Sequence, residues 1–554
     1  MLEQNQPHSG SRIFDSQNKI VRYNVAAFLA FTRFLQRPCG ISSTSLRCPV
    51  TRVAGITKKF RQVKSFVNQQ DFRSSPAWSP RKSERLLLLL WILSLPLLNP
   101  IVHGDGVGYY AYARALLIQH NLRFEEDWRH ANLYFSQART LPNGQLSPNE
   151  YTETGYVANL FTIGPAILWS PFLLAAHSFV LVANALGANI PANGFSTPYL
   201  LAMALGTATY GFLGLFFSYL LARRYIEERW ALLSTVAIWG GSSLLVYMYF
   251  NPAWSHAHSA FAVAFFLWYW DRTRDCRTTF QWILLGLLAG LMVDVYFPNG
   301  VFLLLPLIES LLAYRSSWKE KNLRKAAQLF TANASFLVVA IVVFIPTLVT
   351  RWIIFGGIFR FGTYGELAWD WTAPYWRSIL FSTEHGLFTW TPILALSVAG
   401  LFLAPRAAKS ITLYLGVGAA AYYYLISSYP YWHGTASFGN RYFIPLTPVF
   451  IFGFAMLLQR FGILFHSASR AFAISAALCF SLVAWNAGFI FQWGAHLIPA
   501  RGPVSFSEVA RNQFFVVPRQ LSAQLRAYLF RRKALMQQIE DRDIQQLKKN
   551  PPTP

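Results

Sequence analysis

The chain has 554 residues, of which 54% are hydrophobic, 17% aromatic and only 13% charged, and its mean hydropathy is +0.31. Soluble domains contain about a quarter of charged residues, so this composition excludes an ordinary soluble protein and indicates a membrane protein. The net charge of +24 would suggest a nucleic-acid partner in a soluble protein. Because no basic face interleaved with stacking aromatic residues occurs outside the hydrophobic segments, we expect contact with anionic membrane lipids and no nucleic-acid partner.

The N-terminal residues, 1–80, are polar and basic. This composition predicts a cytoplasmic N-terminal arm that is partly disordered. An organellar transit peptide would have a similar, acid-poor composition. We do not expect a signal peptide, because the arm has no apolar run followed by a small-residue cleavage site.

Hydrophobic segments of membrane-spanning length occupy most of the chain from residue 86 onward. Eleven of them lie at residues 86–102, 198–222, 230–249, 257–271, 280–296, 299–314, 328–350, 386–404, 410–427, 442–459 and 470–492. The sequence therefore predicts an all-α polytopic membrane protein with about eleven transmembrane helices, in a membrane domain that covers residues 86–495.

A twelfth apolar segment, residues 160–186, decides the topology. If it does not cross the membrane, the loops on one side hold Arg223, Arg224, Arg229, Arg272, Arg274, Arg277, Arg315, Lys319, Lys321, Arg324, Lys325, Arg406, Lys409, Arg460 and Arg470. The short loops opposite hold only Arg351, Arg360, Arg377 and Arg441. Because Lys and Arg gather in cytoplasmic loops, we expect 160–186 to be re-entrant or interfacial, which the kink-forming residues Pro165 and Pro171 also favour.

This topology has two consequences for the ends of the domain. Residues 103–197 become one large first external loop that contains amphipathic and re-entrant helices. Residues 496–554, which are basic, also fall on the external side. We expect them to form a basic, partly helical C-terminal tail that lies at the membrane interface.

The first external loop begins with a carboxylate in a glycine-rich turn, Asp105, within His103-Gly104-Asp105-Gly106-Val107-Gly108. Apolar residues follow at positions 109, 112, 113, 116 and 117, a spacing typical of an amphipathic helix on a membrane surface. A carboxylate fixed there is suited to take a proton from a hydroxyl as a general base. The alternative is that Asp105 only caps this helix.

A second carboxylate, Glu153, lies in Tyr151-Thr152-Glu153-Thr154-Gly155-Tyr156, just before the proline-broken segment. It is a candidate to orient the acceptor or to share the work of the base with Asp105. The alternative is a solvated loop carboxylate without a catalytic role.

A polar loop late in the chain, residues 429–442, ends in Gly439-Asn440-Arg441-Tyr442 at the entrance of a hydrophobic segment. The Arg441 guanidinium is suited to hold a phosphate, because it presents a fork of hydrogen-bond donors. His433 and Asn440 are candidates to add donors. The alternative for Arg441 is a cation that anchors the helix at the membrane interface.

Two further loops on the same side carry candidate substrate contacts. His256 lies in the short loop 251–259 and is a candidate to assist Arg441 at the phosphate. The loop 351–385 mixes aromatic and charged residues, as sites for sugars and lipid headgroups do. From these elements we expect substrate contacts from Tyr109, Tyr112, Glu366, Glu384 and His385.

No metal or other cofactor is expected. The four cysteines, Cys39, Cys48, Cys276 and Cys479, have neither the spacing of metal ligands nor that of a disulfide framework. No Asp-X-Asp motif lies near Asp105 or Arg441. A reaction at this site is therefore predicted to be independent of metal.

These residues together resemble the GT-C superfamily of integral-membrane glycosyltransferases. The chain looks most like the bacterial branch related to protein O-mannosyltransferases and lipid A aminoarabinose transferases. The similarity is carried by Asp105 with Tyr109-Tyr110-Ala111-Tyr112-Ala113-Arg114, by Gly164-Pro165 to Pro171, by Ala222-Arg223-Arg224-Tyr225 and by Gly439-Asn440-Arg441-Tyr442. The chain departs from the family in separating the two prolines and in having Asn440 where many members have proline.

The resemblance implies inverting transfer of a sugar from a polyprenyl-phosphate carrier to a lipid, glycan or protein acceptor. It places the family's first-loop carboxylate on Asp105 and implies a bacterial inner membrane, with the active site on the external face. Two other functions stay open from the residues alone. One is a flippase or transporter for a lipid-linked glycan, although no clear internal repeat is visible. The other is a glycan polymerase or ligase that uses the loop 351–385.

Overall fold

The computed structural model describes residues 80–131, 139–141, 143–274, 276–360 and 369–549. All of them belong to the second of the chain's two units, Phe72–Pro554. Within these residues the chain is helical, and the isolated bridges Thr140–Leu146 and Tyr151–Val157 are its only extended pairings. The predicted all-α class is confirmed for this part. The arm 1–80, except its last residue, and the candidate Glu366 lie outside the described residues.

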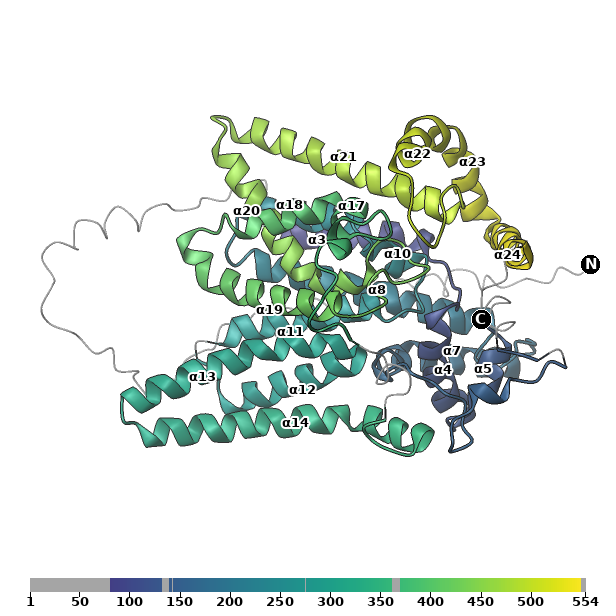
Figure 1. Ribbon diagram of the computed structural model, residues 1–554, viewed down its shortest axis with the longest axis horizontal. Coiled ribbons are helices and arrows are strands. Elements are labelled where there is room, and N and C mark those ends of the chain that lie inside the picture. The colour runs from purple at the N-terminus through teal and green to yellow at the C-terminus, as the bar shows by residue number, and fades with distance from the viewer. Residues whose placement is uncertain (1–79, 132–138, 142, 275, 361–368, 550–554) are drawn as a thin grey trace, which may run out of the picture. The chain divides into compact units, whose positions relative to one another are not determined.

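The helices follow one another as shown in Figure 1. In chain order they are α3 (Pro80–Ser94), α4 (Asp105–Arg114), α5 (Glu125–Arg129), α7 (Gly164–Ala185), α8 (Thr197–Ala222), α9 (Glu228–Gly241), α10 (Leu244–Tyr249), α11 (His256–Thr273), α12 (Thr279–Val295) and α13 (Leu304–Lys319). They continue with α14 (Leu323–Phe355), α16 (Ser378–Phe381), α17 (Leu387–Trp390), α18 (Pro392–Leu401), α19 (Lys409–Ser427), α20 (Thr447–Ile463), α21 (Ala468–Gly494), α22 (Phe506–Arg511), α23 (Val517–Phe530) and α24 (Arg532–Lys549). Short turns of 3₁₀ or π helix join them: η1 (Leu95–Leu97), η2 (Ala115–Gln119), η3 (Pro148–Glu150), η4 (Phe297–Leu303), η5 (Arg406–Ala408), η6 (Arg441–Leu446) and η7 (Asn512–Val516).

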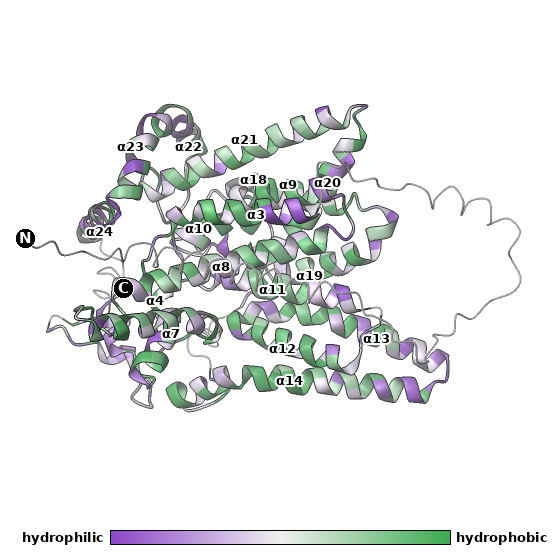
Figure 2. Ribbon diagram, turned by 180° about the vertical axis from the view of Figure 1, so that it is seen from behind, coloured by the Kyte–Doolittle hydropathy of each residue, from purple (hydrophilic) through white to green (hydrophobic). Residues whose placement is uncertain are grey.

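Seven helices of the described part are long and apolar enough to cross a membrane. Six of them coincide with predicted spans, and they contain α8, α13, α14, α19, α20 and α21. Figure 2 shows α14 and α21 hydrophobic along most of their length. The seventh is α7, the segment for which the charge count predicts no crossing. The number of eleven crossings and the path of α7 stay predictions.

The other five predicted spans form shorter or broken helices. Within the segment 230–249, helix α9 ends at Gly241 and helix α10 begins at Leu244. Asn486 of α21 donates its amide to the carbonyls of Gly240 (2.8 Å) and Ser242 (3.2 Å), which the break leaves without helix partners. Backbone groups buried this deep need such partners. The interruption is therefore stabilised by a polar side chain from another helix.

Two glycines let α18 and α20 pack with their backbones in contact. A Cβ placed on Gly453 would lie 2.1 Å from the carbonyl oxygen of Ser397, and one on Gly400 would lie 1.9 Å from that of Gly453. Helices in membranes associate through such small residues. Alanine at either position would push the two helices apart, and α20 is the helix that continues from Arg441.

The loops that the charge count assigned to the cytoplasm meet at one end of the helices. Arg223, after α8, pairs with Glu84 of α3 at 2.7 Å. Arg224 pairs with Asp271 of α11 at 2.9 Å. Further along, Arg277 pairs with Glu309 of α13 at 3.2 Å. At the opposite end of α3, the hydroxyls of Ser94 and Tyr249 lie 2.6 Å apart, and the chain then turns toward Asp105.

The helix after Asp105 differs from its prediction. The spacing of apolar residues predicts an amphipathic helix on the membrane surface, but every residue of α4 from Gly106 to Arg114 is buried. The segment before α7 covers one side, where the Asn159 amide donates to the Gly108 carbonyl at 2.9 Å. Arg114 is held at the other end by an ion pair with Asp127 (2.5 Å). Small residues at several positions of α4 make room for this covering.

The C-terminal helices dock near the end of α3. Tyr528 of α23 donates its hydroxyl to the carbonyl of Leu97 at 2.7 Å. The guanidinium of Arg532, in α24, donates to the carbonyl of Pro96 at 2.6 Å and also to that of Leu98. The predicted tail therefore folds into helices, and they lie at the end of α3 that leads to Asp105.

Candidate functional site

An ion pair joins the two residues that the sequence singles out most strongly. Nη2 of Arg441 lies 2.7 Å from Oδ2 of Asp105, although the residues are 336 positions apart in the chain. The Arg441 side chain is 6% exposed and that of Asp105 is 35% exposed. The carboxylate is therefore open to a second molecule while its cationic partner is enclosed.

Asp105 is held in place by a tight turn against the loop before α11. Gly104 has φ +56°, a conformation that favours glycine, and a Cβ on Gly106 would lie 2.6 Å from the Cβ of Ala253. Asp105 is the first residue of α4, one position after the N-cap residue, Gly104. Whether Asp105 acts as a base or only stabilises the start of this helix is not decided by this position. The carboxylate still benefits from the positive end of the helix dipole.

Arg441 is held by aromatic rings. Its guanidinium carbon lies 4.2 Å from the ring centre of Trp254 and 5.2 Å from that of Tyr442. The indole Nε1 of Trp254 in turn donates to the carbonyl of His103 at 3.0 Å. The ring that holds the cation is thus fixed to the turn that carries Asp105.

The Arg441 guanidinium has donors to spare. Its Nε and Nη1 are buried, and within the described residues neither has a hydrogen-bond partner. A buried charged donor without an acceptor is costly, on the order of 1–3 kcal/mol or more. These two donors flank Nη2, which is bonded to Asp105, and they suit an anionic group with several oxygens, such as a phosphate.

His256 lies beside this pair within a group of aromatic rings. Its ring centre is 5.0 Å from that of Tyr247, 5.8 Å from Tyr296 and 6.3 Å from Tyr442. The Nδ1 atom of His256 is buried and has no partner among the described residues. The rings of Trp254 and Tyr442 therefore lie beside both His256 and the Arg441 guanidinium. The role of His256 at a phosphate stays a prediction.

Tyr109 faces the same ion pair from α4. Burial raises the pKa of its hydroxyl above the usual value, and the negative charge of Asp105 raises it further. The hydroxyl therefore stays protonated at neutral pH and is able to donate. Tyr112, one turn later, is buried and donates to the carbonyl of Asn159 at 3.2 Å. Its contact is with the protein rather than with an open site.

The remaining candidates of the late loops form a second cluster. His385 Nδ1 donates to the carbonyl of His433 at 2.7 Å, and Nδ1 of His433 lies 3.4 Å from Oε1 of Glu384. Asn440 donates its amide to the carbonyl of Trp432 at 3.1 Å. Nδ1 of His433 accepts the backbone N–H of Thr435 at 3.2 Å, so its contact with Glu384 is a close approach and not a second hydrogen bond. The hydrogen bonds of His385 and Asn440 are made to carbonyls of the loop 429–442.

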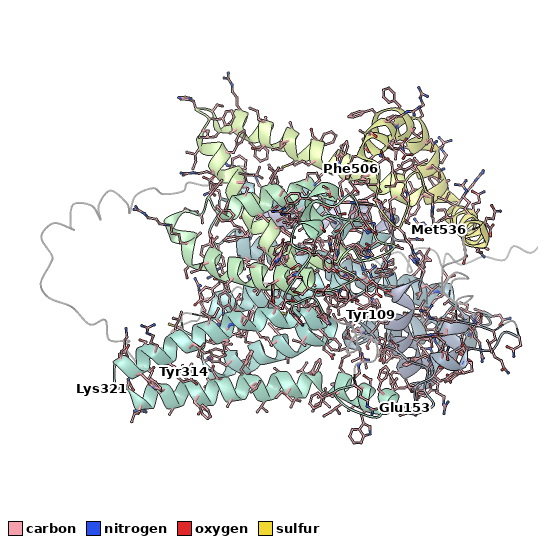
Figure 3. All side chains as sticks on the ribbon, viewed as in Figure 1. Tyr109, Glu153, Tyr314, Lys321, Phe506 and Met536 are labelled. Atoms are coloured by element: carbon pink, nitrogen blue, oxygen red, sulfur yellow. The ribbon has the colours of Figure 1, made fainter. Side chains whose placement is uncertain are left out.

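Glu153 lies apart from the ion pair. Its side chain is 89% exposed and pairs with Arg360 at 3.1 Å. Figure 3 shows Glu153 well separated from Tyr109 of α4. This position agrees with the alternative of a solvated loop carboxylate.

Sequence reasoning overlooked Trp254, although it considered the loop 251–259 for its histidines. The available signal is a tryptophan in a short polar loop between two hydrophobic segments, on the side assigned to Asp105 and Arg441. An aromatic face beside a predicted buried cation is a reason to pair the two. The same reasoning would have drawn attention to Tyr442, the residue after Arg441.

Nothing in the described residues groups three or more His, Cys, Asp or Glu side chains as metal ligands would be grouped. The ion pair places a buried guanidinium, bounded by aromatic rings, beside a partly exposed carboxylate. Searches against protein-family models and against curated proteins found no match to this chain.

Proposed function

We propose that the protein is a membrane glycosyltransferase that moves a sugar from a polyprenyl-phosphate carrier to a hydroxyl of a lipid, glycan or protein acceptor. The observation that carries the proposal is the Asp105–Arg441 pair, in which a buried guanidinium retains unpartnered donors beside a partly exposed carboxylate. The Arg441 guanidinium suits the phosphate that leaves, and the Asp105 carboxylate suits the proton of the attacking hydroxyl.

In the proposed reaction the acceptor oxygen attacks the anomeric carbon. A bond forms between these two atoms, the bond from the anomeric carbon to the phosphate oxygen breaks, and the configuration inverts. Asp105 takes the proton of the acceptor hydroxyl. Arg441 neutralises the polyprenyl phosphate as it leaves, with His256 beside it. In this scheme the named residues supply charge, a proton acceptor and orientation.

The ion pair itself gives the first step of this cycle. A phosphate that binds Arg441 competes with Asp105 for the Nη2 donor. As the phosphate takes over that donor, the carboxylate becomes available to the acceptor hydroxyl. The donor substrate would in this way prepare the base before chemistry begins.

The proposed setting is a bacterial inner membrane. The N-terminus lies in the cytoplasm, about eleven helices cross, and the site opens on the external face. Support comes from the loops rich in arginine and lysine that meet at the end of the helices away from Asp105. Figure 2 shows hydrophilic residues at the ends of the long hydrophobic helices, as is usual for helices that cross a membrane.

The experiment is a transfer assay with the full chain in nanodiscs. The donors are a panel of radiolabelled polyprenyl-phosphate sugars, and a membrane lipid extract supplies the acceptor. Three proteins are compared: wild type, Asp105→Asn and the control Asp541→Asn. Asp541 is an exposed carboxylate on α24. We expect transfer by wild type and the control, and a loss of about 100-fold or more with Asp105→Asn.

Donor binding is measured in parallel, because the outcomes differ in meaning. Binding by wild type without any transfer across the whole panel would support a flippase instead. Full turnover by Asp105→Asn would show that another group is the base.

A further inference from the structure

The C-terminal helix α23 has an exposed apolar face. Leu521, Leu525 and Leu529 follow one another at intervals of four residues and are 44%, 44% and 39% exposed. At 3.6 residues per turn they form one stripe along the helix. Arg519 and Arg526 lie on a different face, and both are exposed. Apolar and cationic side chains are thus separated around the helix.

One edge of α23 is fixed to the rest of the protein. Tyr528 bonds to the carbonyl of Leu97 and its ring lies 5.7 Å from that of Phe250. Arg532, just after the helix, bonds to the carbonyls at the end of α3 and stacks on Tyr528 at 4.3 Å. The helix is therefore held at the level where the first hydrophobic helix ends, and the leucine stripe is left uncovered.

The segment that precedes α23 in the chain also keeps this helix close to the end of a long hydrophobic helix, α21. Only residues 495–505 separate the long apolar helix α21 from α22, and α23 follows directly after η7. Figure 1 shows α22 and α23 beside the C-terminal half of α21. Phe514 and Phe515, in η7, are 69% and 61% exposed. The apolar surface thus continues from a helix of spanning length into α23.

The charges of the neighbouring side chains indicate what covers the apolar surface of α23. The exposed cations of the region are Arg501, Arg511, Arg519, Arg526, Arg531 and Lys533. A second copy of the helix would bring equal charges together, whereas an anionic lipid surface would neutralise them. An apolar stripe beside arginines is the pattern of helices that lie in the membrane interface.

We propose that α23 is an interfacial helix. It inserts Leu521, Leu525 and Leu529 among lipid acyl chains, and its arginines bind anionic headgroups, in the leaflet next to Asp105. This proposal does not depend on the proposed transfer reaction.

A cross-linking experiment with the full chain tests the insertion. Photoreactive p-benzoylphenylalanine replaces Leu525 in one variant and Ala523 in the other, in nanodiscs that contain radiolabelled phosphatidylcholine. Ala523 is also exposed but lies on the opposite face of the same helix. We expect the Leu525 variant to incorporate several-fold more lipid label. Equal labelling, no labelling, or protein dimers formed from position 525 would overturn the proposal.

Hydrogen exchange tests the contribution of charge. Peptides that cover 517–530 are followed in the full chain, in nanodiscs of phosphatidylcholine alone and in nanodiscs that also contain phosphatidylglycerol. Each arginine near an anionic surface contributes roughly fivefold in binding. We expect anionic lipid to slow exchange in wild type and to have little effect on Arg519→Gln/Arg526→Gln. Exchange that is independent of anionic lipid in wild type would remove the headgroup part of the proposal.

Discussion

The indole of Trp254 holds both halves of the candidate site at once. Its ring lies 4.2 Å from the Arg441 guanidinium, and its Nε1 donates to the carbonyl of His103, two residues before Asp105. Through this one side chain, the position of the cation depends on the position of the turn that carries the carboxylate.

Replacing Trp254 separates these two contacts. Trp254→Phe keeps an aromatic face for Arg441 and loses the bond to His103, whereas Trp254→Leu loses both. Because a desolvated cation–π contact contributes up to about 2 kcal/mol, we expect the leucine variant to bind the donor about tenfold more weakly than the phenylalanine variant. Donor titrations with the two purified variants measure the difference. Equal affinity would mean that the ring does not hold Arg441.

Arg441→Lys tests the fork of donors. Lysine keeps the charge but cannot present the parallel N–H groups that suit a phosphate. Since hydrogen bonds to charged groups contribute about 1.5–3 kcal/mol each, we expect affinity for a polyprenyl monophosphate to fall by roughly 10- to 100-fold.

The matched control is Arg360→Lys, which makes the same change at an ion pair that is 64% exposed on the arginine side. Surface pairs contribute only about 0–1 kcal/mol, so the control should bind as wild type does. A similar loss in both variants would show that the effect is not specific to the site.

Glu153→Gln distinguishes the two candidate carboxylates. Because Glu153 is 89% exposed and pairs only weakly with solvent-facing Arg360, we expect transfer within about twofold of wild type, since such surface pairs contribute little. Turnover is measured beside Asp105→Asn under the same conditions. A large loss in Glu153→Gln with a small one in Asp105→Asn would reverse the assignment of the base.

His385 should make stability depend on pH. Burial lowers the pKa of its imidazole to about 4, from an ordinary value near 6.5. The unfolded chain therefore binds a proton that the folded chain does not between these two values. The stability contributed by the neutral ring is fully present above about pH 6.5 and declines by roughly 3 kcal/mol at most as the pH falls toward 4.

His385→Asn should weaken this dependence. Asparagine tolerates the backbone at this position, where φ is +54°, and its amide is able to donate to the His433 carbonyl as Nδ1 does. We expect the thermal midpoint of wild type to drop more between pH 7.5 and pH 5 than that of the variant. His466→Asn, at an exposed histidine, is the control. Identical drops in wild type and His385→Asn would assign the pH dependence to other groups.

Hydropathy predicted most of the long helices, because a segment long enough to span a bilayer is legible from composition alone. It did not predict the break between α9 and α10, since the amide that stabilises it comes from Asn486, far along the chain. It was also wrong about the surroundings of α4. The apolar spacing of a helix does not reveal that a later loop will cover its other face.

The sequence also predicted the candidate site only in part. The residue types of Asp105 and Arg441 made them candidates for a base and an anion ligand, and the predicted topology assigned both to one side. Their direct pairing was beyond the sequence, because nothing local to either residue specifies a partner 336 positions away. Trp254 was missed for the same reason, because its two contacts, with Arg441 and with the His103 carbonyl, are made to other segments of the chain.

The separation of Asp105 and Arg441 along the chain has a consequence for biosynthesis. At about 5–20 residues per second, a ribosome needs roughly 17–70 s to add the 336 residues between them. During that interval Asp105 has left the ribosome but Arg441, its ion-pair partner, has not yet been made. Any nascent chain that stops before Arg441 therefore carries Asp105 without this ion pair.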